Sequence, residues 1–277
     1  MKKRLLSGML AGLMALSMVA CGSSADTAAS DSATADTTDT ATESDVDYIK
    51  NKGTLIVGIT DFAPMDYKDD NGEWIGYDAD LARAVADSLG VDVEFVEIDW
   101  DNKILELQNK SIDVVWNGMT LTPEVTNAME CTKPYLNNAQ VVVVSNDKAA
   151  EITSVDAAAD LSFAVESGSA GEAAASENGF DYVAVKSQAD AVMEVAAGTS
   201  DACIIDLLMA GAMVGEGTSY PDLTYTVELT SEEYGIGCRK GSDLAAYIND
   251  ELKALYEDGT MNAIGEEYGV QAAIVKQ

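Results

Sequence analysis

The sequence Thr54-Leu-Ile-Val-Gly-Ile59, with the two segments that follow it, decides the fold. This short run of apolar and β-branched residues is typical of a buried strand. Residues 79–89 come next with apolar side chains at helical spacing, and residues 91–98 form a second strand-like run. A strand, a helix and a strand in this order predict a βαβ unit with parallel strands.

The same alternation continues along the chain. Further strands are expected at 112–116, 140–144, 161–165, 182–185, 202–205 and 234–239, and helices at 100–109, 170–177, 188–197, 207–214, 244–258 and 261–268. This order implies an α/β fold with mostly parallel sheets and helices on both faces. Residues 107–113 and 195–201 each precede a strand that ends on a polar residue. The weak internal symmetry predicts two similar lobes of about a hundred residues each.

Composition excludes several classes of protein. The chain has 277 residues, of which 16 are Lys or Arg and 48 are Asp or Glu, and its formal net charge is −32. Such a charge argues against a surface that grips nucleic acid or anionic lipid. Histidine is absent, which excludes Ser-His and Cys-His catalysis and histidine metal sites. No CxxC motif or carboxylate cluster has the spacing of a metal site, so neither a metal nor a cofactor is expected.

The first 45 residues are expected to lie outside the folded body. Residues 1–20 have a basic start and an uncharged apolar stretch that ends at Ala20, which is typical of a signal peptide. Cys21 follows at once, so this segment resembles the lipobox of bacterial lipoproteins, with Met18 where Leu is usual. We therefore expect residues 21–45 to be a lipidated Cys21 and a disordered acidic tether. The protein would be extracytoplasmic and lipid-anchored to the outer face of the cell membrane.

Polar residues at the ends of the predicted strands mark a candidate cleft. Ligands of open α/β sheets bind beyond the carboxyl ends of the strands, and two such edges facing one another would enclose a ligand. The candidate ligand-binding residues are Asp61, Phe62, Trp100, Asn117, Gly118, Thr120, Glu166, Ser169 and Asp206.

Several motifs in a fixed order resemble one known family. They are Gly58-Ile-Thr-Asp-Phe-Ala-Pro-Met65, Gly76-Tyr-Asp-Ala-Asp-Leu-Ala82, Asp99-Trp-Asp101, Ile112-Asp-Val-Val-Trp-Asn-Gly-Met-Thr-Leu-Thr-Pro-Glu124 and Tyr234-Gly-Ile-Gly-Cys-Arg-Lys-Gly241. The chain resembles the family 3 extracellular solute-binding proteins, the receptors of polar amino-acid ABC importers. The resemblance implies a two-lobed type II periplasmic-binding-protein-like fold, with two crossing strands and hinge closure on ligand. Lobe 1 would comprise residues 46–141 plus 232–277, and lobe 2 residues 142–231.

The resemblance also assigns roles to the first lobe's candidates. Phe62 and Trp100 match aromatic residues that flank the ligand, where a cationic ligand would gain cation–π energy. Ordinary core packing is the alternative for both residues. Asn117, Gly118 and Thr120 match the segment whose backbone and hydroxyl groups meet the ligand's amino and carboxylate groups.

The second lobe's candidates also have an alternative each. Ser169 can bind an anion together with the exposed N–H groups of the helix that it begins, or it can simply cap that helix. Asp206 matches the carboxylate that holds the ligand α-ammonium. Its alternative role is the N-cap of the helix that follows.

One position departs from the family pattern. The family usually has an Arg, which grips the ligand carboxylate, where this chain has Val125. Arg83 and Arg239 fall away from the predicted cleft, and Lys103 fits either an inward position or a solvated helix face. The carboxylate is then held by backbone N–H groups at 120–122 and 169–171, or the ligand is amine-rich and not an ordinary α-amino acid. Acidic residues beside aromatic rings favour ligand ammonium groups.

We therefore expect a monomeric transport receptor without enzymatic activity, which captures an amino acid or an amine-bearing solute and delivers it to an ABC permease. An enzyme on the same fold, a dehydratase or a peptidoglycan lyase, is the first alternative, with Glu166 or Asp61 as its acid or base. A sensor that acts through a partner protein is the second. Three cysteines remain after Cys21, so at least one is expected to be free, and whether Cys131 pairs with Cys238 is open.

Overall fold

Two β-sheets organise residues 44–277, the part of the chain that the computed structural model describes. Both sheets belong to one compact unit of the chain. The predicted signal peptide, Cys21 and most of the predicted tether lie outside the described residues. Within residues 44–277, none of the helices has the length and apolar character that a membrane crossing needs.

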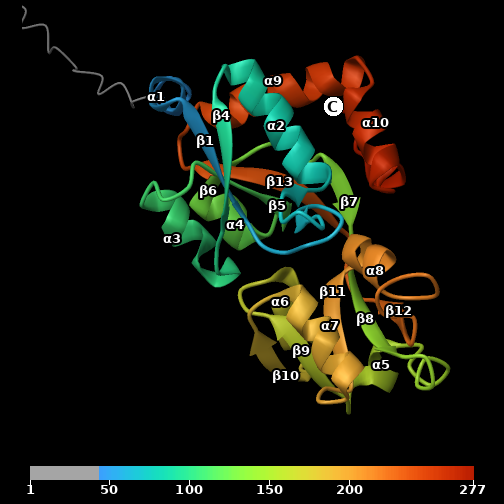
Figure 1. Ribbon diagram of the computed structural model, residues 1–277. Coiled ribbons are helices and arrows are strands. Elements are labelled where there is room, and N and C mark those ends of the chain that lie inside the picture. The colour runs from blue at the N-terminus through green and yellow to red at the C-terminus, as the bar shows by residue number, and fades with distance from the viewer. Residues whose placement is uncertain (1–43) are drawn as a thin grey trace, which may run out of the picture. The chain divides into compact units, whose positions relative to one another are not determined.

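The first sheet is built on the βαβ unit that the sequence predicts. Its strand order is β4 (Asp92–Glu97), β1 (Thr54–Ile59), β5 (Val114–Thr120), β13 (Glu232–Arg239) and β6 (Met129–Cys131), and β7 (Leu136–Asn138) also pairs with β13 (Figure 1). Strand β1 is parallel to both β4 and β5. Strand β13 is antiparallel to β5. The expectation of mostly parallel strands is therefore only partly right for this sheet.

The second sheet has the same mixed character. Its order is β10 (Asp181–Val185), β9 (Ser162–Glu166), β11 (Ala202–Asp206), β8 (Gln140–Ser145) and β12 (Leu223–Glu228). Strand β9 is parallel to β10 and β11, whereas β8 is antiparallel to β11 and β12. The chain enters this sheet on β8, directly after β7, and returns to the first sheet on β13. After these two crossings, β8 and β13 run antiparallel to the neighbouring strands β11 and β5.

Helices cover both faces of each sheet, and the alternation of side chains along the strands shows why. On β5, Val114 and Trp116 pack in the core beneath α2 (Tyr77–Leu89), α9 (Leu244–Glu257) and α10 (Thr260–Glu267). Val115 and Met119 point to the opposite face, with α3 (Lys103–Gln108) and α4 (Pro123–Ala128). Successive strand residues face opposite sides of a sheet, so one apolar strand serves two cores.

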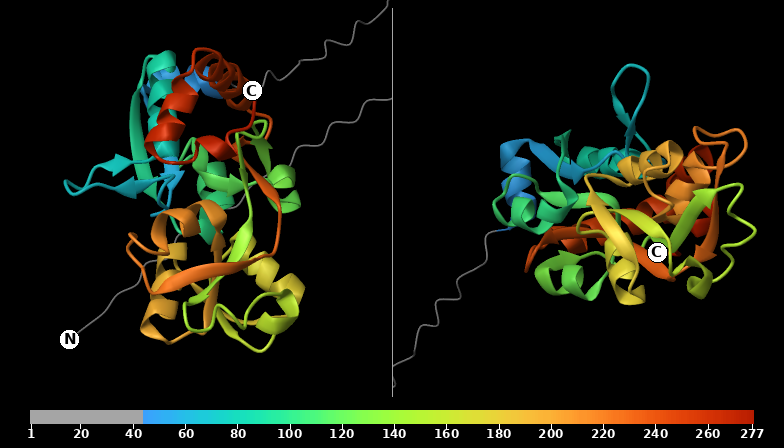
Figure 2. Two further views of the ribbon diagram at one scale, coloured as in Figure 1. Left: turned by 90° about the vertical axis from the view of Figure 1, so that its right-hand side faces the viewer. Right: turned by 90° about the horizontal axis from the view of Figure 1, so that it is seen from below.

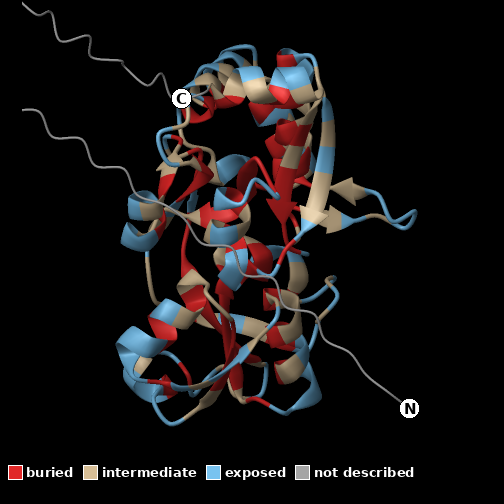
Figure 3. Ribbon diagram, turned by 90° about the vertical axis from the view of Figure 1, so that its left-hand side faces the viewer, coloured by how far each residue is buried: buried red, intermediate tan, exposed pale blue. Residues whose placement is uncertain are grey.

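Strand β8 repeats this arrangement in the second sheet. Val141 and Val143 lie in the core with α7 (Gln188–Ala197), and Val142 and Val144 lie in the core with α6 (Ala170–Asn178). In Figure 3 the strands of both sheets are largely buried, whereas the exposed residues gather on the helices and loops. The continuous apolar run at 140–144 follows from burial on both faces.

The remaining elements are short. They are α1 (Asp45–Lys52), β2 (Tyr67–Lys68), β3 (Trp74–Ile75), η1 (Trp100–Asn102), α5 (Val155–Ala158), α8 (Leu207–Met213) and η2 (Gln271–Ala273). Strands β2 and β3 form a two-stranded hairpin of their own, which stands off the first sheet (Figure 2). The acidic segment 69–73 is the turn that joins these two strands.

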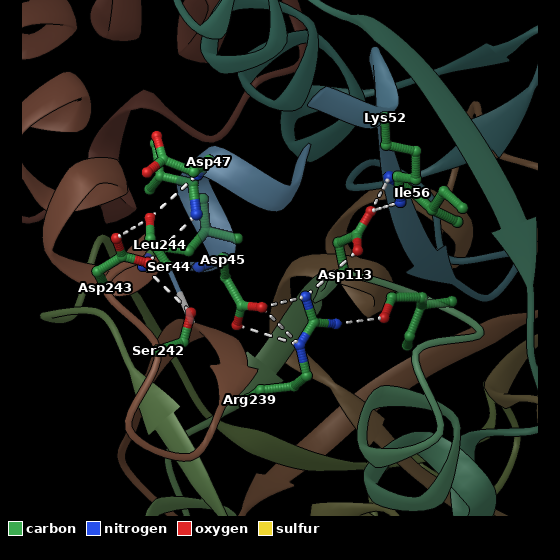
Figure 4. Close-up of polar contacts among 12 residues, drawn as sticks. Ser44, Asp45, Asp47, Lys52, Ile56, Asp113, Arg239, Ser242, Asp243 and Leu244 are labelled. Atoms are coloured by element: carbon green, nitrogen blue, oxygen red, sulfur yellow. Dashed lines mark hydrogen bonds and ion pairs between the residues drawn. The ribbon is translucent and has the colours of Figure 1, made fainter. Parts of the chain in front are cut away.

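Helix α1 begins at Asp45, the last residue of the predicted tether. Ser44 caps this helix, since its hydroxyl oxygen accepts a hydrogen bond from the Asp47 N–H at 3.0 Å. The Asp45 carboxylate binds the Arg239 guanidinium, with an N–O distance of 2.9 Å, and Arg239 also reaches Asp113 at 3.4 Å (Figure 4). Arg239 is therefore engaged at the far end of β13 from the predicted cleft.

The three described cysteines, Cys131, Cys203 and Cys238, are all free. Cys131 and Cys238 lie on the neighbouring strands β6 and β13, but no disulfide joins them. Residues 44–277 contain no group of three or more acidic or cysteine side chains that is placed to hold a metal ion.

Candidate functional site

A cavity of about 270 Å³ lies beside the carboxyl ends of β5, β9 and β11. Ligand pockets of roughly 300–1,000 Å³ hold drug-sized molecules, so this cavity suits a solute of amino-acid size. Eight of the nine predicted ligand-binding residues line it: Phe62, Trp100, Asn117, Gly118, Thr120, Glu166, Ser169 and Asp206. Among the other lining residues are Lys103, whose direction the sequence left open, and Gln188, which was not predicted for the site.

The structure does not bring Asp61 to this cavity. Asp61 is exposed and lines a neighbouring hollow together with Glu97, Lys186 and Asp190. Phe62, the next residue, turns the other way, since its ring is buried and packs edge-on to the Tyr234 ring at a centroid distance of 6.4 Å. Adjacent residues after β1 thus face different hollows.

Asp206 is the centre of a buried hydrogen-bond network. One of its carboxylate oxygens accepts from the Tyr234 hydroxyl at 2.6 Å, from Gln140 at 2.9 Å and from Asn138. Gln188 donates to the other oxygen. The side chain makes no cap hydrogen bond to α8, so capping does not explain the residue.

Burial raises the pKa of Asp206, and the charge of Glu232 raises it further. Hydrogen bonds from Tyr234, Gln188 and Gln140 lower this pKa. Glu232 belongs to the same network, because its carboxylate accepts from Asn138 at 2.7 Å and from Gln140 at 2.8 Å. Two carboxyl groups that share donors in this way favour an added positive charge.

Glu166 is the least satisfied polar group of the cavity. Only 2% of the residue is exposed, and its Oε1 atom has no hydrogen-bond partner among the described residues. Burial raises its pKa to about 8, with a further contribution from the charge of Asp206 and a compensating one from Lys103. A buried carboxyl oxygen without a donor is costly, and a ligand N–H group or ammonium would relieve that cost.

Lys103 enters the cavity from the first turn of α3. The residue is 6% exposed, and its Nζ atom donates to the Gly168 carbonyl at 2.8 Å and to the Trp100 carbonyl at 3.2 Å. The ammonium lies 4.9 Å from the centroid of the Trp100 ring. Burial lowers the pKa of Lys103. In the sequence, only the closeness of Lys103 to Trp100 indicated this inward position, since the i, i+3 spacing fits a solvated helix face equally well.

The polar groups of the first sheet are largely paired inside the protein. The Asn117 side chain accepts from the Thr60 N–H at 3.0 Å and donates to the Thr60 hydroxyl at 2.8 Å. The Gly118 N–H donates to Asp78 at 2.7 Å, and the Thr120 hydroxyl donates to Glu232 at 2.9 Å. These residues fix the outline of the cavity.

Ser169 acts as the N-cap of α6. Its hydroxyl oxygen accepts from the Glu172 N–H at 3.1 Å, and the Glu172 carboxylate in turn accepts from the Gly168 N–H at 2.7 Å. The first N–H groups of a helix have no intrahelical acceptor, and Ala170, the first residue of α6, lines the cavity, so its N–H is a donor that a ligand could use. The cap and the ligand-binding role of Ser169 are compatible.

Two α/β sheets joined by two crossings, with a cavity at their carboxyl edges, define the type II periplasmic-binding fold. Residues 55–271 match the family model of bacterial extracellular solute-binding proteins, family 3, and the chain belongs to this family. The resemblance found in the motifs and the predicted fold class are both confirmed.

Characterised relatives are amino-acid-binding proteins. The L-cystine-binding protein TcyJ of Escherichia coli K12 is 28% identical over 225 residues, which cover 79% of this chain and 84% of TcyJ. The arginine-binding extracellular protein ArtP of Bacillus subtilis is 29% identical over 226 residues, covering 78% of this chain and 86% of ArtP.

Solved structures agree with these relatives. A mutant of the arginine-binding protein ArgBP from T. maritima superposes with a TM-score of 0.76 at 33% identity, covering 81% of this chain and 99% of that protein. The ancestral amino-acid-binding protein AncCDT-1, a precursor of cyclohexadienyl dehydratase, gives a TM-score of 0.74 at 35% identity, with 81% and 99% covered.

Proposed function

We propose that this protein is the receptor of an ABC importer, lipid-anchored through Cys21, that captures an amino acid or a related amine-bearing solute. The two lobes, residues 46–141 plus 232–277 and residues 142–231, would close on the solute and present it to the permease. Family membership and the amino-acid-binding relatives support solute binding outside the cytoplasm. Cys21 itself lies outside the described residues.

One observation carries the proposal: two buried carboxyl groups, Glu166 and Asp206, line a cavity of amino-acid size whose walls include Phe62 and Trp100. An ammonium group placed between the carboxyls would gain charge-assisted hydrogen bonds. A cationic side chain over the Phe62 ring would add about 0.5–2 kcal/mol of cation–π energy, whereas the Trp100 ring already has the Lys103 ammonium 4.9 Å from its centroid.

Titration calorimetry on ligand-free protein tests the proposal. The probes are L-arginine, L-lysine, L-histidine, L-cystine, L-glutamate and L-aspartate, together with agmatine and cadaverine. We expect at least one probe with an additional amine or cationic group to bind, and Glu166→Gln to weaken it more than Asp61→Asn does. Tight binding of glutamate or aspartate, with no binding of the probes that carry an additional amine or cationic group, would contradict the preference for such groups, and no binding of any probe would contradict solute capture.

The membrane anchor has a separate test. In cells, Cys21→Ser should shift the protein from the membrane fraction to the soluble extracytoplasmic fraction and abolish its labelling by a palmitate analogue. A matched control is Cys131→Ser, because Cys131 lies in the folded body and should leave the distribution unchanged. A wild-type protein found only in the soluble fraction would remove the anchor from the proposal.

An enzyme on the same fold remains the second candidate, favoured by one observation. A buried Glu166 with its pKa raised to about 8 would be protonated at neutral pH, as a general acid must be. NMR of a bound probe during long incubation separates the two functions: a receptor returns the probe unchanged, whereas an enzyme accumulates product and loses that activity in Glu166→Gln.

A further inference from the structure

The cavity holds a buried ammonium group with no carboxylate paired to it. The two carbonyl oxygens of Trp100 and Gly168 accept from Lys103 Nζ, and no carboxylate oxygen among residues 44–277 lies within 4.0 Å of that atom. A lysine ammonium has three N–H donors. One donor and the full charge are therefore left without a partner at the cavity wall.

Such an arrangement is expensive in a ligand-free protein. Burying a charge without a counter-ion is unfavourable, even with hydrogen bonds to carbonyls. The acids that act on Lys103 through space are Glu124, Glu166, Asp101 and Glu172, and they do not offset its burial, since its pKa is lowered. A ligand anion at Nζ would remove this imbalance.

The backbone donors at 121–122 and the two arginines Arg83 and Arg239 are already in use. The Leu121 N–H donates to the Glu233 carbonyl at 3.0 Å, and the Thr122 N–H donates to the Thr120 carbonyl at 2.8 Å. Val125 lines the same wall and offers no donor from its side chain. Arg83 is held by Asp80 at 2.8 Å, well away from the cavity lining, and Arg239 is held by Asp45. Backbone groups at 120–122 are thus poor carboxylate binders.

We propose that Lys103 binds the carboxylate of the ligand, in place of the arginine that Val125 cannot supply. The ligand is then a zwitterion, with its carboxylate at Lys103 and its ammonium at Glu166 and Asp206. This inference rests on the proposed function, because it names the chemical class of the solute that the same cavity takes. This proposal replaces the alternative that the ligand is amine-rich and not an ordinary α-amino acid.

The test compares amino acids with the amines that lack their carboxylates. Ligand-free protein is titrated by calorimetry with L-arginine and agmatine, L-histidine and histamine, and L-cystine and cystamine. Wild type should prefer the amino acid in at least one pair. Lys103→Met should weaken that amino acid about 10- to 100-fold. Its affinity for the amine should change by less than about threefold.

Two further variants make the result specific. Lys186→Met removes an exposed ammonium, 62% accessible, from the neighbouring hollow and should leave the amino-acid preference unchanged. Adding Val125→Arg to Lys103→Met should restore part of the preference, since a guanidinium again faces the cavity. Thermal melting of ligand-free Lys103→Met should show no loss of stability, because an unpaired buried charge has been removed.

The outcomes separate the inference from the proposed function. Equal weakening of amino acid and amine in Lys103→Met would overturn the inference, because Lys103 would then only link Trp100 to Gly168. If the wild type binds amines as tightly as amino acids, the inference about Lys103 is also overturned, while the proposed function in solute capture still holds. A wild type that binds no member of any pair would contradict the proposed function, and the inference would fall with it.

Discussion

The two walls of the cavity differ in how far their polar groups are already paired inside the protein. On the wall from the first sheet, Asn117, Gly118 and Thr120 all have partners within the chain. On the wall from the second sheet, Glu166 keeps an unpartnered oxygen and a raised pKa. The first wall therefore sets the shape of the cavity, and in the function that we propose the second wall sets the charge of the solute. Lys103 is the exception on the first wall.

The largest loss of stability and of solute binding is expected when Asp206, the centre of the hydrogen-bond network on the second wall, is replaced. Asp206→Ala leaves the side chains of Asn138, Gln140, Gln188 and Tyr234 without their common acceptor. We expect a loss of about 3–5 kcal/mol in the free energy of unfolding, measured by urea denaturation, because buried donors become unsatisfied. Solute binding should become undetectable. A variant as stable as wild type would show that the network does not hold this wall together.

The charge on the second wall gives a pH-dependent prediction. The pKa of Glu166 is raised from 4.5 to about 8, so between these values the folded protein holds a proton that the unfolded chain has lost. The free energy of unfolding must therefore fall as pH rises through this range. Glu166→Gln removes this loss and should be more stable than wild type at pH 9 by about 2 kcal/mol.

Urea denaturation of both proteins at pH 5, 7 and 9 measures that difference. At pH 5 the two should be nearly equal, because Glu166 is protonated in the folded wild type. Asp206 titrates in both proteins, so its own contribution largely cancels in the comparison. A stability difference that does not change with pH would mean that Glu166 is ionised in the folded state and already paired.

The shape of the first wall is tested at Gly118. Its φ is +56°, and a Cβ atom there would lie 2.6 Å from Phe62 Cε1 and 3.0 Å from Tyr234 Cε2. Gly118→Ala should cost about 1–2 kcal/mol of stability and weaken solute binding, because the Phe62 ring must move. Gly72→Ala is the matched control, since Gly72 has φ +84° and no atom within 4 Å of its Cβ position. If both variants lost the same amount of stability, backbone strain alone would explain the result and the contact with Phe62 would not matter.

The smallest effect is expected outside both walls. Asp61 is exposed and lines a different hollow, so Asp61→Asn should change the affinity for any probe by less than about twofold. Calorimetry with the probe that wild type prefers measures this directly. A tenfold loss would bring Asp61 into the site and extend the charged wall to the first sheet.

The βαβ units and the position of the cavity could be predicted because both depend on local patterns. The apolar run at 54–59 and the helix at 188–197 have the bounds that periodicity indicates. Polar residues at strand ends, such as Glu166 and Asp206, reach the cavity because parallel strands end at one edge. Strands β6 and β7 were not predicted, because each has only three residues. Strand β12 was also missed, although apolar and polar residues alternate along Leu223–Glu228.

Long-range pairing accounts for what the sequence could not indicate. The residues near Asp206 in sequence do not indicate its hydrogen-bond partners. Asn138, Gln140 and Tyr234 reach it from three other strands, β7, β8 and β13. Lys103 has the same spacing on a solvated helix face as on a buried one, so only the closeness of the Gly168 carbonyl decides its direction. The antiparallel entry of β8 and β13 likewise depends on the crossings between the sheets.

The contacts of Arg239 decide where a recombinant form of the folded body should begin. Its guanidinium binds Asp45 on α1 and Asp113 next to β5, and Ser44 donates to Asp243 at 2.6 Å (Figure 4). A recombinant protein that began after Asp45 would leave an arginine on β13 without its main counter-ion. Ser44 is therefore the last residue at which an expressed protein can begin without losing these contacts. A label attached ahead of Ser44 would be connected, through Asp45 and Arg239, to the sheet that shapes the cavity.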